Sequence, residues 1–283
     1  MKTIVPIIRA SLTALVVAAV CLPACDAWAA DDEDGWRFRI APYLWVPGAN
    51  GEVTIDRQTV DVEYSVGEAF DALSNLVSDD DDEEGDDVGE VTDAGSDLDF
   101  AMLAVAEVGK GPWSVMVDFM YLGVTTTEVD PRLPQVGAEF EFDALIFGGS
   151  LTRRLLRDDW GRIDALAGVR YTDLEVALDL RFGDERGLSV ASIEQSWASP
   201  IIGARGRLLL PWRFFLQGYI DIGGAGLGAD FTWQGFAAAG LGFRYVDILV
   251  GYRHLYTDYE NEDDDFVWDL SNSGPIGGVS VHF

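Results

Sequence analysis

Apolar and polar residues alternate with a period of two along most of the chain beyond residue 35. In the stretch Trp36–Val46, large apolar side chains occupy most alternate positions, and Arg37 and Arg39 fall between them. Because successive side chains of a β-strand point to opposite faces, this pattern predicts strands with one apolar face. Ten such stretches follow one another: Trp36–Val46, Asp97–Val108, Pro112–Thr127, Val136–Leu156, Trp160–Arg181, Val190–Leu210, Trp212–Gly228, Phe231–Tyr245, Asp247–Tyr259 and Ser273–Phe283. The pattern therefore predicts an all-β protein.

The connections between these stretches alternate between short turns and longer polar segments. Gly109–Pro112 and Arg157–Asp159 are short, whereas Thr125–Gln135 is long and polar. Short periplasmic turns and long outer loops are typical of outer-membrane barrels. We therefore expect a transmembrane antiparallel up-and-down β-barrel of about ten strands, within a range of 8–12. A hairpin at residues 51–64 would raise the number to twelve if it joined the sheet.

Residues 47–96 interrupt the alternation, and we interpret them as a long extracellular insertion. Ser65–Glu68 fits a helix capping box, so a short amphipathic helix is expected after it. Residues 78–97 hold eleven acidic residues and no basic one, which predicts a disordered, solvated loop. Divalent cations are expected partners there, with four candidate ligands whose spacing does not match an EF-hand loop: Asp79, Asp80, Asp81 and Asp82.

The first 29 residues fit a secretory signal peptide. Lys2 and Arg9 precede or border an apolar segment, and Ala27–Ala29 matches an A-x-A cleavage site. A lipoprotein signal with lipidated Cys25 is the alternative. Cleavage after Ala29 would leave residues 30–283 as a single barrel domain without cysteine, so no disulfide or thiolate site is expected.

The charge balance limits the partners of the protein. The chain has 19 basic and 49 acidic residues, a net charge of -30. Phosphate polymers would be repelled, so nucleic acid is excluded as an expected partner. No segment after the signal is apolar over the roughly 20 residues that a membrane helix needs, yet 48% of the residues are hydrophobic. A membrane protein of this composition must close its sheet into a barrel, because only closure satisfies every backbone group in lipid.

The end of the chain is typical of a closing barrel strand. Val279, Val281 and Phe283 share one face, and the last residue is aromatic. This stretch resembles the closing strand of bacterial outer-membrane barrels, whose terminal Phe is recognised by the barrel-insertion machinery. An ordinary buried last strand of a soluble sheet is the alternative.

Four further motifs occur in a familiar order: Trp36–Trp45, Gly109–Trp113, Ala167–Tyr171 and Gly251–Arg253. They resemble a family of uncharacterised proteobacterial outer-membrane barrel proteins over nearly all of the mature chain. The resemblance implies the outer membrane of a Gram-negative bacterium, with its lipid and lipopolysaccharide as partners. It implies no activity, and residues 78–97 are longer than the usual loop of that family.

The inward strand face carries the candidate functional residues, with arginines towards the short turns and most of the acids towards the long loops. The predicted lumen charge network consists of Arg37, Arg39, Asp118, Glu139, Glu141, Arg153, Arg162, Asp164, Arg170, Arg205, Arg207, Arg213, Asp221, Arg244 and Arg253. A phase slip is expected at Thr172–Asp173, where a bulge would turn Glu175 inward.

Two interpretations of this network stay open. Paired charges can fill a narrow barrel as a polar core. Alternatively, rings of charge can line a narrow passive channel and select ions. A third class of function is cation-dependent binding or adhesion at the acidic outer surface.

Catalytic chemistry is not expected, and no cofactor is expected either. His254 falls on the outward face between two tyrosines, and His282 falls on the inward face beside the C-terminus. Glu139, Glu141 and Asp143 could form a carboxylate pair, but nothing in the sequence fixes which of them would be partners.

Overall fold

The computed structural model describes residues 35–55, 57–67, 69, 95–129, 136–182 and 185–283. The predicted signal peptide, the four candidate metal ligands and most of the predicted acidic loop lie outside these residues. Helical backbone begins at Val66, where the amide of Ala69 donates to the carbonyl of Ser65, but the rest of the predicted helix lies outside the described part.

The described chain forms one antiparallel sheet of twelve strands. The strands are β1 (Trp36–Trp45), β2 (Gly48–Ile55), β3 (Gln58–Tyr64), β4 (Gly95–Lys110), β5 (Trp113–Val129), β6 (Val136–Asp158), β7 (Gly161–Phe182), β8 (Glu185–Leu209), β9 (Phe214–Leu227), β10 (Ala229–Gly242), β11 (Val246–Asn261) and β12 (Phe266–His282). A single 3-10 turn, η1 (Pro211–Arg213), precedes β9.

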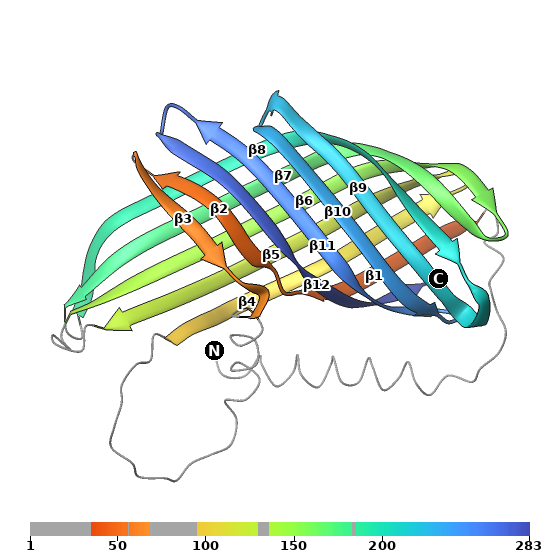
Figure 1. The fold of residues 1–283 in the computed structure, drawn as a ribbon, viewed down its shortest axis with the longest axis horizontal. Helices are drawn as coiled ribbons and strands as arrows, with labels where there is room; N and C mark the ends of the chain where they lie inside the picture. Colours follow the sequence, from red (N-terminus) through yellow and green to blue (C-terminus); the bar gives the residue numbers. More distant parts are fainter. Residues whose placement is uncertain (1–34, 56, 68, 70–94, 130–135, 183–184) are drawn as a thin grey trace, which may run out of the picture.

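The sheet closes on itself because β1 pairs with both β4 and β12. The closing register sets Arg39 opposite His282 and Trp45 opposite Ile276. The other part of β12 pairs with β2, and β3 follows at the edge. The described ring therefore has ten strands, β1 and β4–β12, and the hairpin β2–β3 extends the sheet to twelve (Figure 1).

The wall of the barrel is uneven in length. Strands β6, β7 and β8 contain 23, 22 and 25 residues, whereas β9 and β10 contain 14 each. Roughly 9–11 residues suffice for a tilted strand to cross a membrane. The long strands therefore project well beyond the others, on the left in Figure 1. Residues that were expected in the outer loops therefore belong largely to the extended ends of these strands.

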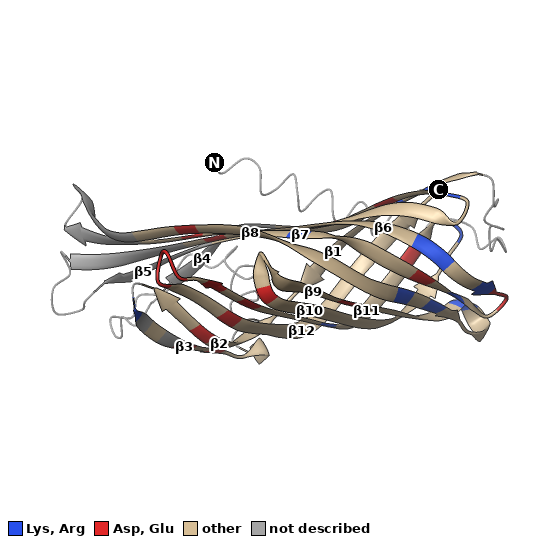
Figure 2. Ribbon diagram, turned by 90° about the horizontal axis from the view of Figure 1, so that it is seen from above, with Lys and Arg blue, Asp and Glu red and all other residues tan. Residues whose placement is uncertain are grey.

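The two ends of the barrel differ in their connections and charge. We call the end that holds Phe283 and the connections β4–β5, β6–β7, β8–β9 and β10–β11 the turn end, and the opposite end the loop end. Most of the basic residues gather at the turn end, and acidic residues predominate toward the loop end (Figure 2). This is the charge separation that the sequence predicted.

The predicted bulge at Thr172–Asp173 is wrong. Pairing between β6 and β7 runs without a shift through Ile146–Thr172 and Leu145–Asp173. The phase therefore continues, so that Leu174 is buried inside the barrel and Glu175 is exposed. Burial of the Leu174 side chain in an apolar cluster favours the uninterrupted register.

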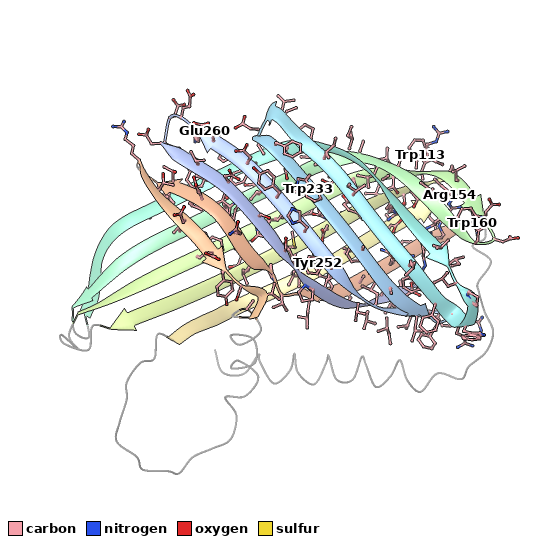
Figure 3. The ribbon with its side chains drawn as sticks, in the orientation of Figure 1. Trp113, Arg154, Trp160, Trp233, Tyr252 and Glu260 are labelled. Atoms are coloured by element: carbon pink, nitrogen blue, oxygen red, sulfur yellow. The ribbon has the colours of Figure 1, made fainter. Side chains whose placement is uncertain are left out.

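The outward face is apolar over much of its height. Large exposed side chains include Ile40, Leu151, Val169, Ile220 and Val250, which are 49–67% exposed. Aromatic residues, including Trp113 and Trp160, lie at the turn end (Figure 3). Among the described residues, no helix is long and apolar enough to cross a membrane.

Candidate functional site

Three sets of side-chain contacts cross the lumen, and we call them the turn tier, the middle tier and the loop tier. In the turn tier, Arg205 of β8 donates to Glu107 of β4 at 2.5 Å and to Asp164 of β7 at 2.8 Å. Strands β4 and β8 are four positions apart in the ring of ten, so the first contact spans the lumen. The hydroxyl of Ser114 also donates to Glu107, at 2.6 Å.

The middle tier is centred on Arg253 of β11. Its guanidinium donates to Asp118 of β5 at 2.7 Å and to the Tyr43 hydroxyl of β1 at 2.7 Å. The path from β11 to β5 around the sheet also takes four strands, so this ion pair joins nearly opposite walls. Tyr43 in turn donates to Asp118 at 2.8 Å, which fixes all three groups.

A second buried ion pair supports the middle tier. Arg170 of β7 donates to both carboxylate oxygens of Asp221, at 2.9 and 2.7 Å. The amide oxygen of Gln234 accepts from Arg170 at 3.1 Å and from Arg253 at 2.9 Å, so it links the two pairs. Arg170 is 5% exposed and Asp221 is 1% exposed. Buried charges are tolerated when they are paired and hydrogen-bonded, as these are.

The loop tier is aromatic. Trp197 of β8 stacks on Tyr259 of β11, with ring centroids 4.0 Å apart. Phe142 of β6 stacks on Trp268 of β12 at 6.4 Å, a contact between strands four positions apart in the ring. Phe266 packs on both Tyr259 and Trp268, at 6.1 and 6.5 Å. Apolar contacts therefore extend across the lumen towards the loop end.

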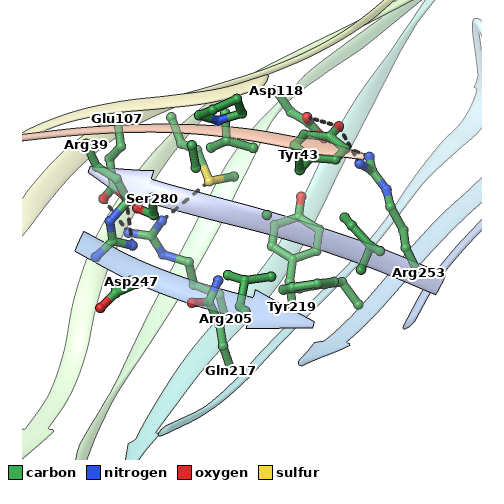
Figure 4. A pocket seen from close by; sticks show the side chains of 18 of the residues that line it. Arg39, Tyr43, Glu107, Asp118, Arg205, Gln217, Tyr219, Asp247, Arg253 and Ser280 are labelled. Carbon is green, nitrogen blue, oxygen red and sulfur yellow. Dashed lines mark hydrogen bonds and ion pairs between the residues drawn. The ribbon is translucent and has the colours of Figure 1, made fainter. Parts of the chain in front are cut away.

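Two main spaces remain inside the barrel. A chamber of about 120 Å³ lies among residues of the turn and middle tiers, including Arg39, Glu107, Arg205 and Arg253 (Figure 4). A vestibule of about 650 Å³ lies at the turn end.

The structure places most of the predicted network on the inward face. The residues of the network that lie in the lumen are Arg37, Arg39, Asp118, Arg162, Asp164, Arg170, Arg205, Arg207, Asp221 and Arg253. Arg213 and Arg244 line the vestibule, where they contact Phe243 and Tyr245.

The prediction for Arg153 is wrong, because this side chain lies on the outward face. It is exposed, and its guanidinium lies 5.3 Å from the ring of Trp113, its partner across the β5–β6 pair. Thr152 is buried and Arg154 is half-buried, so the inward positions of β6 are even-numbered.

The even-numbered inward positions of β6 also concern the two predicted network residues Glu139 and Glu141. Phe142 and Ala144 pack against the loop tier. The side chains of Glu139 and Glu141 lie outside the described residues, but the next described inward positions, Phe142 and Ala144, are apolar. Asp143 accepts a hydrogen bond from Tyr121 at 2.7 Å.

The histidines lie on the faces that the sequence predicted. His254 packs against Trp233 on the outward face, with ring centroids 4.3 Å apart, and contacts Ser273 at 2.6 Å. His282 lines the vestibule, with its Nδ1 atom 4.0 Å from Asp247. At the C-terminus, Phe283 is 69% exposed and stacks on Phe38 at 5.7 Å.

Several central residues were missed by sequence reasoning. Asp247 was not selected for the network, but it lies inward in β11 and accepts from Arg207 at 2.6 Å. Glu107 was not selected either, although it accepts from Arg205 across the lumen. Gln234 and the loop-tier aromatics carry no formal charge, so a search for charged residues passes over them. Glutamine alternating with outward aromatics on β10 is the signal that could have identified Gln234.

No protein-family model matches the chain, and no curated protein matches it in sequence. The predicted membership of the uncharacterised family therefore stays a prediction. In structure, the chain is similar to the outer-membrane protease OmpT from Escherichia coli, with a TM-score of 0.48 and 12% identity, covering 92% of this chain and 99% of that one.

Two further solved barrels are similar. The translocator domain of autotransporter NalP from Neisseria meningitidis matches with a TM-score of 0.38 and 12% identity, covering 99% of this chain and 98% of that one. Neisserial surface protein A matches with a TM-score of 0.34 and 11% identity, covering 88% of this chain and 100% of that one. These similarities concern shape alone, and the proposals below rest on residues of this chain.

Proposed function

We propose that this chain is an integral barrel of the Gram-negative outer membrane whose lumen is closed to ions and small solutes, with a structural rather than a conducting role. The observation that carries the proposal is the ion pair between Arg253 and Asp118, which joins nearly opposite walls at 2.7 Å. Arg253 is only 3% exposed. An open aqueous pore would expose the charged groups that line it to water.

The other tiers support a closed lumen independently. Arg205 reaches Glu107 across the lumen near the turn end, and stacked aromatic rings fill the lumen towards the loop end. A passive channel would need a continuous path past all three levels. The packed polar core is therefore favoured over the narrow channel that the charge pattern also allowed.

The outward face supports the membrane location. A soluble monomer rarely exposes a contiguous apolar patch larger than a few hundred Å². Here Ile40, Ile202 and Val250 are 53%, 61% and 67% exposed, and they belong to strands on different sides of the ring. Closure of the sheet satisfies the strand backbones without water. The short connections at the turn end favour a periplasmic position for that end.

The cation-dependent surface function has no comparable support in the described residues. Within them, no group of three or more His, Cys, Asp or Glu side chains could hold a metal ion. The four aspartates predicted as candidate ligands lie outside the described part of the chain. The closed structural barrel is accordingly the single function proposed.

A liposome-swelling assay tests this proposal. The refolded mature chain is inserted into liposomes and diluted into iso-osmotic arabinose, beside an open porin as positive control. Insertion is verified by protease protection and by the mobility shift of the folded barrel on heating. We expect no swelling above protein-free liposomes. Rapid swelling by a correctly inserted protein would overturn the closed lumen.

A further inference from the structure

The vestibule at the turn end concentrates positive charge in a strongly acidic chain. Seven arginines line it against three side-chain carboxylates, those of Glu107, Asp158 and Asp247, and the main-chain carboxylate of Phe283. The whole chain, by contrast, has a net charge of -30. Average composition would not produce such a surface, so the placement of the arginines is the feature to be explained.

Two of the vestibule carboxylates already bind arginines, Glu107 the turn-tier Arg205 and Asp247 the vestibule Arg207. Glu107 accepts two close hydrogen bonds from Arg205, and Asp247 accepts one from Arg207 at 2.6 Å. Arg39 lies 3.9 Å from Glu107, beyond hydrogen-bonding distance. Arg162 lies 3.9 Å from Asp164, which Arg205 contacts at 2.8 Å. Glu107 and Asp164 are therefore hydrogen-bonded to Arg205, whereas Arg39 and Arg162 lie at a longer distance from them.

Two arginine donor atoms in the vestibule are buried without an acceptor in the described protein. These are Nη1 of Arg37 and Nε of Arg39. A buried donor that lacks an acceptor is costly, by about 1–3 kcal/mol and more when it is charged. Arg37 and Arg39 lie two positions apart on β1, so they project from the same face of one strand into the vestibule.

We infer that the vestibule is a binding site for a phosphate-bearing anion. Guanidinium groups present planar pairs of donors that match phosphate oxygens, and they keep their charge at every physiological pH. The cavity of about 650 Å³ lies within the size range of small-molecule sites. The vestibule adjoins the smaller chamber, with which it shares the lining residues Arg39, Glu107 and Asp247.

Titration with tripolyphosphate tests this site. Calorimetry on the refolded mature protein in zwitterionic micelles gives the dissociation constant at low and high salt. We expect Arg39→Gln to weaken binding roughly tenfold or more, because one hydrogen bond to a charged group is lost. Arg244→Gln removes an exposed vestibule charge outside the tiers, and it is expected to weaken binding by a few fold without affecting folding.

Arg153→Gln provides a matched control. Arg153 lies at the same end of the barrel, but it faces outward against Trp113. Its removal changes the net charge equally and should leave tripolyphosphate affinity within twofold. Equal weakening by Arg153→Gln and Arg244→Gln would overturn the site, since the binding would then reflect general charge. Absence of binding by the folded wild type would overturn it as well.

The phosphate could come from a soluble metabolite or from a lipid headgroup. Nanodiscs of phosphatidylcholine, with or without phosphatidylglycerol, distinguish these sources. A soluble ligand site binds tripolyphosphate equally in both nanodiscs. A headgroup site shows competition, with tripolyphosphate affinity at least tenfold weaker in the anionic nanodiscs. Whichever source the nanodiscs indicate, Arg39→Gln must also weaken the binding of tripolyphosphate if the proposed site is correct.

Discussion

The turn half and the loop half of the lumen are filled by side chains of opposite chemistry. In the turn half, which comprises the turn and middle tiers, Arg205 and Arg253 reach carboxylates on distant strands. In the loop half, Trp197 and Tyr259 stack face to face, with Phe142 and Trp268 on the other side. Charged groups need partners in a defined geometry, whereas aromatic rings need only contact area.

This difference affects what each half can do. A network of arginines and carboxylates leaves donors over when the arginines outnumber the acids, and those donors can bind an anion in the vestibule. The aromatic half has little such capacity, because its tier is built mainly from apolar surfaces. The comparison predicts that truncation in the turn half costs more than truncation in the loop half.

The largest effect is expected from Arg253→Ala. This change leaves the carboxylate of Asp118 without its cross-lumen partner, and breaking one side of a buried ion pair costs about 3–5 kcal/mol. Urea unfolding in micelles, followed by tryptophan fluorescence, measures the loss in free energy of unfolding. Arg57→Ala is the control, since its pair with Asp265 is 81% and 42% exposed and its loss should change stability by less than about 1 kcal/mol. If Arg253→Ala also changed the free energy of unfolding by less than about 1 kcal/mol, the stabilising role of the ion pair between Arg253 and Asp118 would be refuted.

A smaller effect is expected from Tyr259→Leu in the loop half. Leucine keeps an apolar side chain but loses the stacking on Trp197, which is worth about 0.5–1.5 kcal/mol beyond buried area. The loss should not depend on salt concentration, because the contact carries no charge. Unfolding at 0.05 and 0.5 M potassium chloride checks both statements. A strong salt dependence of the loss would contradict an aromatic tier.

The smallest effect is a gain, on the outward surface of the loop half. Asp258 of β11 lies opposite Asp269 of β12, which lies opposite Glu52 of β2. Like charges directly opposite each other in a sheet are destabilising. Asp269→Asn should therefore stabilise the barrel by about 0.2–1 kcal/mol at neutral pH.

The gain should disappear in acid. Asp258 lies beyond the roughly 9–11 residues of β11 that would cross the membrane, and burial together with the carboxylates of Asp269, Asp230 and Glu260 raises its pKa above the ordinary value. The folded state therefore holds this proton more tightly, and stability falls as the pH rises through the raised pKa. Comparing unfolding of wild type and Asp269→Asn at pH 7 and pH 3 tests this. An equal gain at both pH values would exclude charge repulsion as its cause.

The period-two pattern was sufficient to predict the barrel. Strands such as Trp36–Val46 were predicted almost to the residue, because Arg37 and Arg39 alternate there with large apolar residues. The predicted strand Ser273–Phe283 begins seven residues too late, because β12 begins at Phe266. Asp269, Ser271 and Asn272 resemble a loop in sequence. Pairing with β11 along that whole stretch supplies the hydrogen bonds that make it a strand.

The interior was only partly predictable. Most inward charges near the turn end could be identified, because arginines there alternate with apolar residues, although Arg153 lies on the outward face. The ion-pair partners of these charges could not be identified, since Arg253 and Asp118, for example, are 135 residues apart in the chain. Near the loop end, aromatic residues occupy inward positions, so polarity no longer distinguishes the two faces. The false bulge at Thr172–Asp173 follows directly from that loss of contrast.

Single-channel recording in a planar bilayer tests the central claim most directly. The mature protein is recorded in potassium chloride, with and without residues 78–94 of the predicted loop, which precede β4, after its folding has been verified by the heat-dependent mobility shift. The closed lumen predicts no discrete conductance steps from either form, because the three tiers lie in the barrel itself rather than in that loop. Reproducible steps with charge selectivity from the folded protein would contradict the account.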